Sequence, residues 1–303
     1  MTVEWIAVDW GTSRLRAWAM NGDKPIASAI SDDGMGGLSA DEFEQKLLSL
    51  IEPWLGDHVT PDISTPVIAC GMIGAREGWA SAPYRAVPCA PHAETMTRAP
   101  AQDPRISVFM IPGLSQPQPA DVMRGEETQI AGFLSQNPKF DGVLCLPGTH
   151  TKWAHISAEE VVSFRTFMTG EIFELLTTRS VLRHNIGEGL DQPAFTEAIG
   201  DAMAKPEAIA ARLFSLRSES LLAGLDPDVA RGRLSGFLIG MELAASRPYW
   251  LGRQVAVIGT PQLSSLYGAA LATQGIVAAE FEGGIMNLIG LVSAYRSFRS
   301  QTG

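Results

Sequence analysis

The sequence predicts an α/β protein of two domains. It has 303 residues, and a chain of this length ordinarily forms two domains of roughly 150 residues each. Short apolar runs alternate with segments of helical periodicity, as in folds whose helices cover a buried sheet. One pattern also occurs twice, because Asp9–Arg14 and Pro147–Lys152 each place a Gly-Thr turn between two apolar runs. This repeat indicates that the two domains are related.

Composition and charge exclude several classes of protein. Hydrophobic residues make up 46% and charged residues 18%, which is typical of a globular chain rather than a disordered one. The formal net charge of −10 argues against a nucleic-acid partner, because phosphate contacts need a basic surface. The longest apolar run, Leu234–Ala245, contains Glu242 and is shorter than the ~20 residues of a membrane span. Glu4 and Asp9 argue against a signal peptide.

The three cysteines indicate a reducing environment. Their odd number and their spacing, at Cys70, Cys89 and Cys145, match neither a disulfide framework nor a metal site. Two of them lie inside apolar runs, where buried free thiols are the expected state. We therefore expect a cytoplasmic protein.

The first part of the chain predicts a mixed sheet with one helix. Ser39 and Glu42 have the spacing of a capping box, and Phe43 to Trp54 carry apolar residues at helical spacing, so a helix is expected there. Apolar runs bounded by turn residues predict strands over 3–9, 15–20, 25–30, 66–70 and 106–111.

The segment Ser115–Asp121, which contains prolines, is the best candidate for a domain boundary. The predicted domains are therefore residues 1–116 and 117–303. Beyond the boundary, strands are expected over 142–146, 152–156, 162–167 and 255–258. Helices are expected over 125–134, 171–182, 195–205, 207–215, 234–245, 264–273 and 285–295.

The two Gly-Thr turns are candidate anion sites. Glycine lets the backbone approach a ligand closely, and successive N–H groups with Thr or Ser hydroxyls form an anion-binding nest. Asp9, at the end of the strand before the first turn, is a candidate Mg²⁺ ligand acting through water, although a residue that merely caps the turn would look the same. The chain has no P-loop motif, no Gly-x-Gly-x-x-Gly after a strand and no paired histidines for zinc.

These motifs resemble those of the superfamily of ATPases that contains sugar kinases, heat-shock chaperones and actin. Residues 9–17 resemble its first phosphate motif, residues 146–153 its second, and residues 255–260 its adenosine motif. The resemblance implies an actin-like ATPase fold with two ribonuclease-H-like cores and a central cleft, with ATP and Mg²⁺ as cofactors. It implies that ATP and its phosphates are bound by Gly11, Thr12, Ser13, Arg16, Gly148, Thr149, His150, Lys152, Gly259 and Thr260.

A closer resemblance is to the 2-dehydro-3-deoxygalactonokinase family. It extends in order over almost the whole chain and rests on residues 70–74, 78–79, 82–84, 122–129, 147–153 and 168–171. The chain departs from the family pattern at Ala75-Arg76-Glu77 and at Arg179. The resemblance implies an ATP-dependent transferase of galactonate and galactose catabolism. This kinase would phosphorylate the terminal hydroxyl of 2-dehydro-3-deoxy-D-galactonate to give the 6-phosphate.

Phosphoryl transfer to a hydroxyl needs a group that takes the hydroxyl proton. In kinases of this superfamily that group is a carboxylate on the helix before the second phosphate turn, where this chain has Glu126 and Glu127. The pair Glu127-Thr128 resembles the Asp-Thr of hexokinases, which favours Glu127 as the catalytic base over Glu126. Acidic residues also favour helix N-termini through the helix dipole alone, so a structural role is the alternative.

The candidate substrate contacts come from several segments. Arg165 is the best candidate for a substrate carboxylate, since it lies in a strand just ahead of Thr169-Gly170-Glu171 and, if buried, needs an anionic partner. The full set is Arg76, Trp79, Tyr84, Arg124, Arg165 and Glu171. The alternatives are core packing for the aromatic residues, solvent exposure for Arg124 and Lys152, and a structural role for His150.

Two other functions remain open at this stage. A kinase of a neutral sugar would share the superfamily motifs, and a requirement for a carboxylate on the substrate separates it from a sugar-acid kinase. A sugar-sensing regulator would share the fold but need a DNA-binding segment, for which the sequence shows no helix-turn-helix. The expected partners are a sugar acid and ATP, with no nucleic acid and no membrane. A homodimer is possible.

Overall fold

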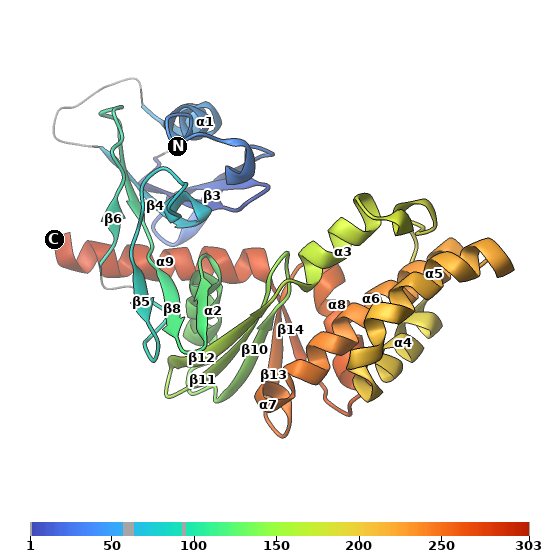
Figure 1. Ribbon diagram of the computed structural model, residues 1–303. Helices are drawn as coiled ribbons and strands as arrows, with labels where there is room; N and C mark the ends of the chain where they lie inside the picture. Colours follow the sequence, from blue (N-terminus) through green and yellow to red (C-terminus); the bar gives the residue numbers. More distant parts are fainter. Residues whose placement is uncertain (1, 57–63, 93–94, 303) are drawn as a thin grey trace. The chain divides into compact units, whose positions relative to one another are not determined.

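The computed structural model describes residues 2–56, 64–92 and 95–302 (Figure 1). The chain divides into two compact units. Unit 1 contains residues 1–140, 157–163 and 283–303, and unit 2 contains residues 141–156 and 164–282. These units do not follow the predicted division after residue 116, because the segment after it and the C-terminal helix both pack within unit 1.

The sheet of unit 1 has six strands in the order β3-β2-β1-β4-β7-β6. β1 and β2 are antiparallel, as are β2 and β3, whereas β1, β4 and β7 are parallel. The strands are β1 (Trp5–Trp10), β2 (Leu15–Asn21), β3 (Lys24–Ser31), β4 (Thr65–Gly71), β6 (Thr97–Arg98) and β7 (Ile106–Met110).

The side-chain alternation of β1 assigns its residues to two cores. Ile6, Val8 and Trp10 belong to the core that includes α1 (Phe43–Ile51). Trp5 and Ala7 belong to the core formed with α9 (Gly283–Thr302), and the ring of Trp5 stacks on Tyr295 at 4.2 Å. Because side chains alternate along a strand, Asp9 lies on the same side as Trp5 and Ala7, facing α9.

α2 (Glu126–Gln136) packs tightly on α9. A Cβ atom at Gly132 would lie 1.9 Å from the Met286 carbonyl oxygen, and one at Gly290 would lie 2.0 Å from the Thr128 carbonyl oxygen. Only glycine at these two positions permits the close approach of the helices. The contact fixes the first turn of α2 against the start of α9.

The predicted boundary segment is not a linker. It forms the antiparallel hairpin of β8 (Gly113–Pro117) and β9 (Ala120–Met123), and β5 (Tyr84–Ala86) pairs with β8 to complete a three-stranded sheet. The prolines gave a linker-like pattern because they lie at the end of the hairpin, with Pro117 as the last residue of β8 and Pro119 in the turn.

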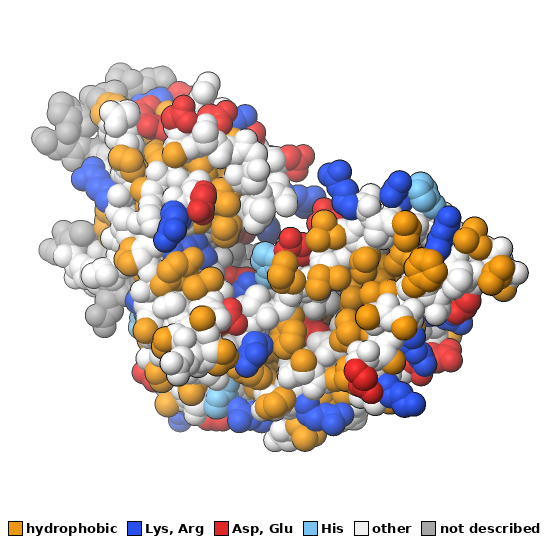
Figure 2. All heavy atoms as spheres, in the orientation of Figure 1, with side chains coloured by type: hydrophobic (Ala, Val, Ile, Leu, Met, Phe, Trp, Pro, Cys, Tyr) orange, Lys and Arg blue, Asp and Glu red, His pale blue; other side chains and the backbone are white. Residues whose placement is uncertain are grey.

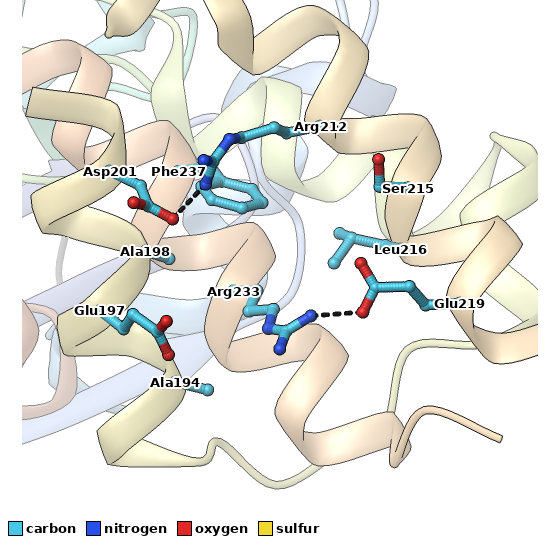
Figure 3. A pocket seen from close by; sticks show the side chains of 10 residues that line it. All are labelled: Ala194, Glu197, Ala198, Asp201, Arg212, Ser215, Leu216, Glu219, Arg233 and Phe237. Atoms are coloured by element: carbon cyan, nitrogen blue, oxygen red, sulfur yellow. Dashed lines mark hydrogen bonds and ion pairs between the residues drawn. The ribbon is translucent and has the colours of Figure 1, made fainter. Parts of the chain in front are cut away.

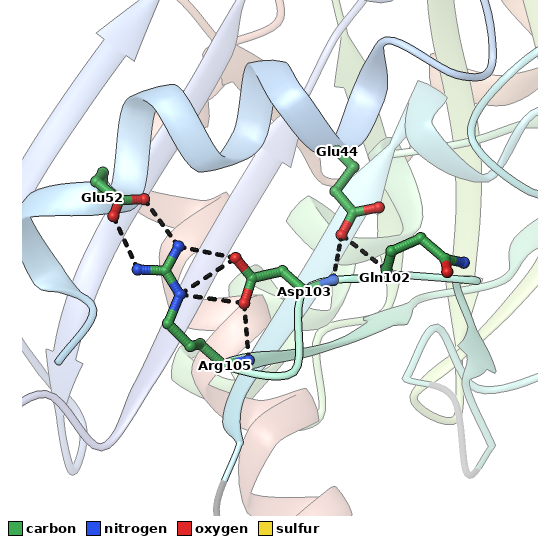
Figure 4. A network of polar contacts seen from close by, with 5 residues as sticks. All are labelled: Glu44, Glu52, Gln102, Asp103 and Arg105. Atoms are coloured by element: carbon green, nitrogen blue, oxygen red, sulfur yellow. Dashed lines mark hydrogen bonds and ion pairs between the residues drawn. The ribbon is translucent and has the colours of Figure 1, made fainter. Parts of the chain in front are cut away.

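A network of charged side chains joins α1 to the segment before β7 (Figure 4). The Arg105 guanidinium pairs with Glu52 at 2.8 Å and with Asp103 at 2.8 Å. One carboxylate oxygen of Glu44 accepts hydrogen bonds from the backbone N–H groups of Gln102 and Asp103, each at 2.7 Å. These contacts hold both ends of α1 against the segment that leads into β7.

The sheet whose strands lie mainly in unit 2 has the order β12-β11-β10-β13-β14, which repeats the order β3-β2-β1-β4-β7 of unit 1. The strands are β10 (Gly142–Leu146), β11 (Thr151–Ser157), β12 (Glu160–Phe167), β13 (Val255–Gly259) and β14 (Ala279–Glu282). Each of the two Gly-Thr turns joins the first two strands of its sheet, so the predicted internal repeat is confirmed. β14 was not expected, because its mostly exposed residues lack an apolar pattern.

Helices make up most of the rest of unit 2. They are α3 (Thr169–Thr178), α4 (Gln192–Ala204), α5 (Ile209–Ala223), α6 (Pro227–Ala245), α7 (Arg247–Trp250) and α8 (Pro261–Ala272). α6 begins before the predicted residue 234, because the Asp226 side chain caps it and Pro227 fits its first turn. The predicted helix over 171–182 instead ends at Thr178, where Ser180 starts a 3₁₀ turn over Val181–His184. Further 3₁₀ turns cover Met35–Gly37, Glu52–Trp54, Met72–Gly74 and Pro206–Ala208.

Large apolar side chains remain exposed on these helices, as Figure 2 shows over α3 and α5. Among them, Phe214 is 64% exposed and Leu222 is 88% exposed, both on α5. No helix in the described part of the chain is both long and apolar enough to cross a membrane.

We expect Gly290→Ala to lower the free energy of unfolding by about 1–3 kcal/mol or more, because the added methyl group overlaps the backbone of α2. Gly200→Ala is the matched control, since Gly200 lies inside α4 with nothing within 4 Å of a Cβ. In the control, the free energy of unfolding should rise by about 0.5–1 kcal/mol, because alanine has a higher helix propensity than glycine. Urea denaturation of both variants measures the difference, and equal stabilities would contradict the tight α2–α9 contact.

Candidate active site

Unit 1 gathers several polar side chains around the end of β1. In the sheet register, Asp9 is paired with Arg16 on β2 and with Cys70 on β4. Asp9 is only 8% exposed, and its Oδ2 lies 3.5 Å from Arg16 Nη2. Burial raises the pKa of the Asp9 carboxyl above its usual value, and the nearby Arg16 only partly offsets this effect.

Asn287, from the start of α9, completes the surroundings of Asp9. This side chain is 2% exposed and hydrogen-bonds the Asp9 carboxyl group. The Cys70 thiol lies 3.5 Å from Asn287 Oδ1 and 3.9 Å from Asp9 Oδ1. Asn287 was not among the predicted site residues, although its polar side chain between the apolar positions of the final helix was a usable signal.

The two glutamates at the start of α2 have different environments. Glu127 has no exposed surface, and its oxygens accept hydrogen bonds from the Gly125 N–H at 2.6 Å and the Thr128 hydroxyl at 3.0 Å. Burial, with a smaller contribution from the neighbouring charge of Glu126, raises the pKa of Glu127 to about 7. Glu126 is half-buried, and one of its oxygens accepts a hydrogen bond from the Arg124 N–H at 3.0 Å.

Arg124 is a buried arginine. No carboxylate of the described residues lies within ion-pair distance of its guanidinium. Arg124 is 9% exposed, one amino group donates to the Ala82 carbonyl oxygen at 2.7 Å, and the guanidinium lies 4.4 Å from the centre of the Tyr84 ring. Its Nε and Nη1 atoms are buried and have no hydrogen-bond partner in the described part of the chain. Such donors are costly to bury unless a ligand accepts from them.

The other predicted residues of unit 1 lie in varied settings. In the first turn Thr12 and Ser13 are exposed, and the backbone of residues 34–36 supports the turn, with the Gly36 N–H donating to the Thr12 carbonyl oxygen at 2.9 Å. Trp79 is 8% exposed and packs in the core beside α1, and Arg76 is exposed. The alternative of core packing therefore describes Trp79, whereas Tyr84 is 43% exposed.

In unit 2 the second turn presents its backbone between β10 and β11. Thr149 and His150 are exposed, and Lys152, which is only 5% exposed, donates to the His150 carbonyl oxygen at 3.2 Å. His150 Nε2 lies 2.6 Å from a carboxylate oxygen of Glu171 on α3. The Glu171 N–H in turn donates to the Thr149 carbonyl oxygen at 3.0 Å, so α3 supports the turn.

The predicted adenosine motif lies beside this turn. β10 and β13 are parallel, which brings the ends of both strands to one edge of the sheet. A Cβ atom on Gly259 would lie 3.0 Å from Pro147 Cγ. Thr260 caps α8 by accepting a hydrogen bond from the Leu263 N–H.

Arg165 was predicted to bind the substrate carboxylate on the condition that it is buried, and this condition is not met. It is exposed on β12, so its charge does not need a buried anionic partner. The argument from burial applies instead to Arg124. The sequence pattern could not separate the two arginines, because the exposure of a strand residue depends on what covers the sheet.

One pocket of the helical part of unit 2 is lined by none of the predicted site residues. It has a volume of about 280 Å³, lies between α4, α5 and α6, and is lined by Ala194, Glu197, Ala198, Asp201, Arg212, Ser215, Leu216, Glu219, Arg233 and Phe237 (Figure 3). Its arginines are paired, Arg212 with Asp201 and Arg233 with Glu219. Within the described residues, no group of three or more His, Cys, Asp or Glu side chains is placed to hold a metal ion.

The repeated sheet order and the Gly-Thr turn in each unit define the class of protein by its fold, which is the actin-like ATPase fold that sugar kinases share. Within that class the chain belongs to the 2-keto-3-deoxy-galactonokinase family, whose family model matches residues 9–294. The match begins at Asp9 and ends in α9, so it includes every residue of the candidate site.

Individual relatives agree with this family. The chain is 37% identical over 279 residues to a probable 2-dehydro-3-deoxygalactonokinase of Rhizobium meliloti, with 89% of each chain covered. It is 33% identical over 283 residues to the 2-dehydro-3-deoxygalactonokinase of Escherichia coli, with 91% of each covered. A crystal structure from Sinorhizobium meliloti, assigned to the same activity, matches with a TM-score of 0.87 at 35% identity and covers 97% of this chain and 96% of its own.

The raised pKa of Glu127 makes the stability of the protein depend on pH. The carboxyl titrates near 4.5 when unperturbed and near 7 in the folded protein, so the folded state holds an extra proton between these values. The free energy of unfolding therefore falls as the pH rises through this range, by up to about 3 kcal/mol at about 1.4 kcal/mol per pKa unit.

Glu127→Gln removes this contribution, and we expect urea denaturation across the range to show a shallower pH dependence than in the wild type. Glu242, whose pKa is also raised to about 7 by burial, keeps its own contribution in the variant. Identical pH dependence in the two proteins would mean that Glu127 does not titrate in this range.

Proposed function

We propose that the protein transfers the γ-phosphoryl group of ATP to the terminal hydroxyl of 2-dehydro-3-deoxy-D-galactonate, giving the 6-phosphate in galactonate catabolism. The observation that carries the proposal is the set of two buried carboxyl groups, Asp9 and Glu127, in a chain that matches this kinase family from Asp9 to residue 294. The end of β1 supplies Asp9 and the start of α2 supplies Glu127. Phosphoryl transfer to an alcohol needs one group that takes the hydroxyl proton and one that holds the metal ion.

Glu127 is the catalytic base in this proposal. A pKa of about 7 matches the pH at which a general base is most effective. Each carboxylate oxygen has two lone pairs, so the bonds from Gly125 and Thr128 orient the group and leave acceptor capacity for the substrate hydroxyl. As the hydroxyl oxygen bonds to the γ-phosphorus and the bond to the ADP oxygen breaks, Glu127 takes the hydroxyl proton.

Asp9 is the proposed ligand for Mg²⁺, acting through water. Mg²⁺ keeps several waters and uses one or two carboxylates together with substrate phosphates, so a single carboxylate such as Asp9 can serve as its protein ligand. The charge of Glu126 also acts on Asp9, which adds negative potential at the same place. The ion would neutralise charge on the phosphates. Asn287 and Arg16 would keep the Asp9 carboxylate in its orientation.

Both Gly-Thr turns are proposed phosphate sites. In the first, Gly11, Thr12 and Ser13 offer backbone N–H groups and hydroxyls, of which the two hydroxyl residues are exposed. In the second, Gly148, Thr149 and His150 do so, and the buried Lys152 adds positive charge behind the turn. Gly259 and Thr260 are the proposed contacts of the adenosine.

Arg124 is the proposed partner of the substrate carboxylate. Its two buried donors without a partner and its place two residues before Glu126 support this role. Tyr84, whose ring lies against the guanidinium, holds the arginine in place and is partly exposed to contact a sugar. Arg76, Trp79 and Glu171 remain further candidates for substrate contact, and the exposed Arg165 is the weaker alternative to Arg124.

A cytoplasmic location and a homodimer are further parts of the proposal. The three cysteines are all free, which supports a reducing compartment. The exposed apolar side chains of α3 and α5 support self-association.

Replacing the base should reduce catalysis without reducing ATP binding. We expect Glu127→Gln to lower kcat by about 10²–10⁴-fold and to leave the dissociation constant for ATP within a few-fold of the wild type. Glu126→Gln is the matched control on the same helical turn and should retain most of kcat. Steady-state kinetics gives kcat for each variant, and a separate binding measurement gives the dissociation constant for ATP. If Glu126→Gln causes the larger loss, Glu126 is the base, and if neither variant loses activity, a carboxylate base on α2 is excluded.

The substrate should require a carboxylate. In an ATP-consumption assay, we expect kcat/KM for 2-dehydro-3-deoxygalactonate to exceed that for glucose, galactose or glycerol by about 10²-fold or more. Arg124→Ala should lower kcat/KM for the acid by about 10²-fold, because the substrate charge loses its buried partner, and should leave the KM for ATP unchanged.

Arg165→Ala is the control for this experiment, since it removes an exposed arginine. It should change kcat/KM by no more than a few-fold. Equal activity of the wild type on a neutral sugar would overturn the sugar-acid assignment. If Arg165→Ala lowers kcat/KM for the sugar acid more than Arg124→Ala does, Arg165 is the residue that binds the substrate carboxylate.

A further inference from the structure

Glu242 is a buried carboxyl group for which the proposed reaction has no use. It is 2% exposed, lies on α6 and projects into the apolar core that contains Trp153, Ile239 and Tyr267. In the sequence it interrupts the longest apolar run of the chain. Burying a carboxyl group in such a core destabilises a fold unless hydrogen bonds satisfy it.

The hydrogen-bond donors around Glu242 come from three other elements. Trp153 Nε1 on β11 donates to Oε1 at 2.7 Å, and the Tyr267 hydroxyl on α8 donates to Oε2 at 2.8 Å. The hydroxyl of Thr169, the first residue of α3, also hydrogen-bonds the carboxyl group. Thr151 Oγ1 lies 2.9 Å from the Tyr267 hydroxyl and extends the network to a second residue of β11.

These three elements are the ones that surround the second Gly-Thr turn. β11 begins at Thr151, directly after the turn. α3 packs on the turn so closely that a Cβ atom on Gly170 would lie 2.2 Å from the Gly148 carbonyl oxygen. α8 follows Gly259 and Thr260, the proposed adenosine contacts. Glu242 is therefore hydrogen-bonded to three of the elements beside the turn, namely β11, α3 and α8.

We propose that Glu242 is a positioning residue that holds the second Gly-Thr turn and the start of α8 in the arrangement that binds ATP, an inference that rests on the proposed function of this turn. An apolar side chain of the same size would pack in this core at least as well as a carboxyl group, so stability alone does not account for a glutamate here. Phosphate binding by backbone N–H groups does depend on their orientation before the ligand arrives. A carboxylate that accepts from three elements fixes that orientation.

The test compares Glu242→Met, which keeps the volume and removes the acceptors, with Glu242→Gln, which keeps one oxygen acceptor. We expect Glu242→Met to raise the dissociation constant for ATP about tenfold or more, and Glu242→Gln to raise it less. The dissociation constant for the sugar acid should stay within about twofold in both variants. The melting temperature of Glu242→Met should stay close to that of the wild type even though ATP binding is weaker. This result separates a positioning role from a general loss of stability.

One further variant serves as a control and another as a second approach. Ile239→Val trims a neighbouring side chain of the same helix and core without touching the network, and should leave ATP binding unchanged. Tyr267→Phe removes a single donor hydroxyl and should weaken ATP binding in the same direction as Glu242→Gln, which keeps the inference testable if Glu242→Met does not fold.

Gly148→Val separates failure of this inference from failure of the proposed function. Nothing lies within 4 Å of a Cβ at Gly148, so the variant should fold, and its side chain should obstruct phosphate at the turn. If Gly148→Val weakens ATP binding while the Glu242 and Tyr267 variants bind ATP as the wild type does, the positioning role is wrong and the phosphate site stands. If Gly148→Val itself binds ATP normally, the turn is not a phosphate site and both proposals fail.

Discussion

The contact between α2 and α9 is the constraint on which the candidate site of unit 1 depends. Two glycines, Gly132 and Gly290, allow the helices to approach until each backbone touches the other. That approach fixes the first turn of α2, which carries Glu127, against the first turn of α9, which carries Asn287. Because α9 also covers the sheet, Asn287 reaches Asp9 on β1. If α2 and α9 packed loosely, the distances among Glu127, Asn287 and Asp9 would vary.

The candidate sites in the two units differ in how much of their polar chemistry is buried. Asp9 and Glu127 are almost or fully buried, and their raised pKa values follow from the loss of water around the carboxyl groups. In unit 2 the turn residues Thr149 and His150 are exposed, and the buried carboxyl group of Glu242 lies behind them. In unit 1 the buried carboxyl groups are themselves the proposed catalytic base and Mg²⁺ ligand, whereas in unit 2 the buried carboxyl group supports exposed groups that would meet a ligand.

The internal repeat has a physical basis that the sheets make visible. In each unit a hairpin forms the first two strands of the sheet, and a parallel strand lies beside the first of them. The turn of the hairpin therefore emerges at the edge where the parallel strand also ends. Gly259 reaches Pro147 in unit 2 for this reason, and Cys70 reaches Asp9 in unit 1 for the same reason.

The sequence by itself determined the main strands, the repeated Gly-Thr turns and the family, since these depend on local patterns of apolar residues and glycines that survive without knowledge of the packing. It also selected Asp9 and the Glu126-Glu127 pair, because strand ends and helix starts are local features. Only the tertiary structure decided what was buried. It exposed Arg165 and buried Arg124, and it brought Asn287 to Asp9 from 278 positions away in the chain. Burial and long-range contacts depend on which helix covers which face of a sheet, and no local pattern encodes that choice.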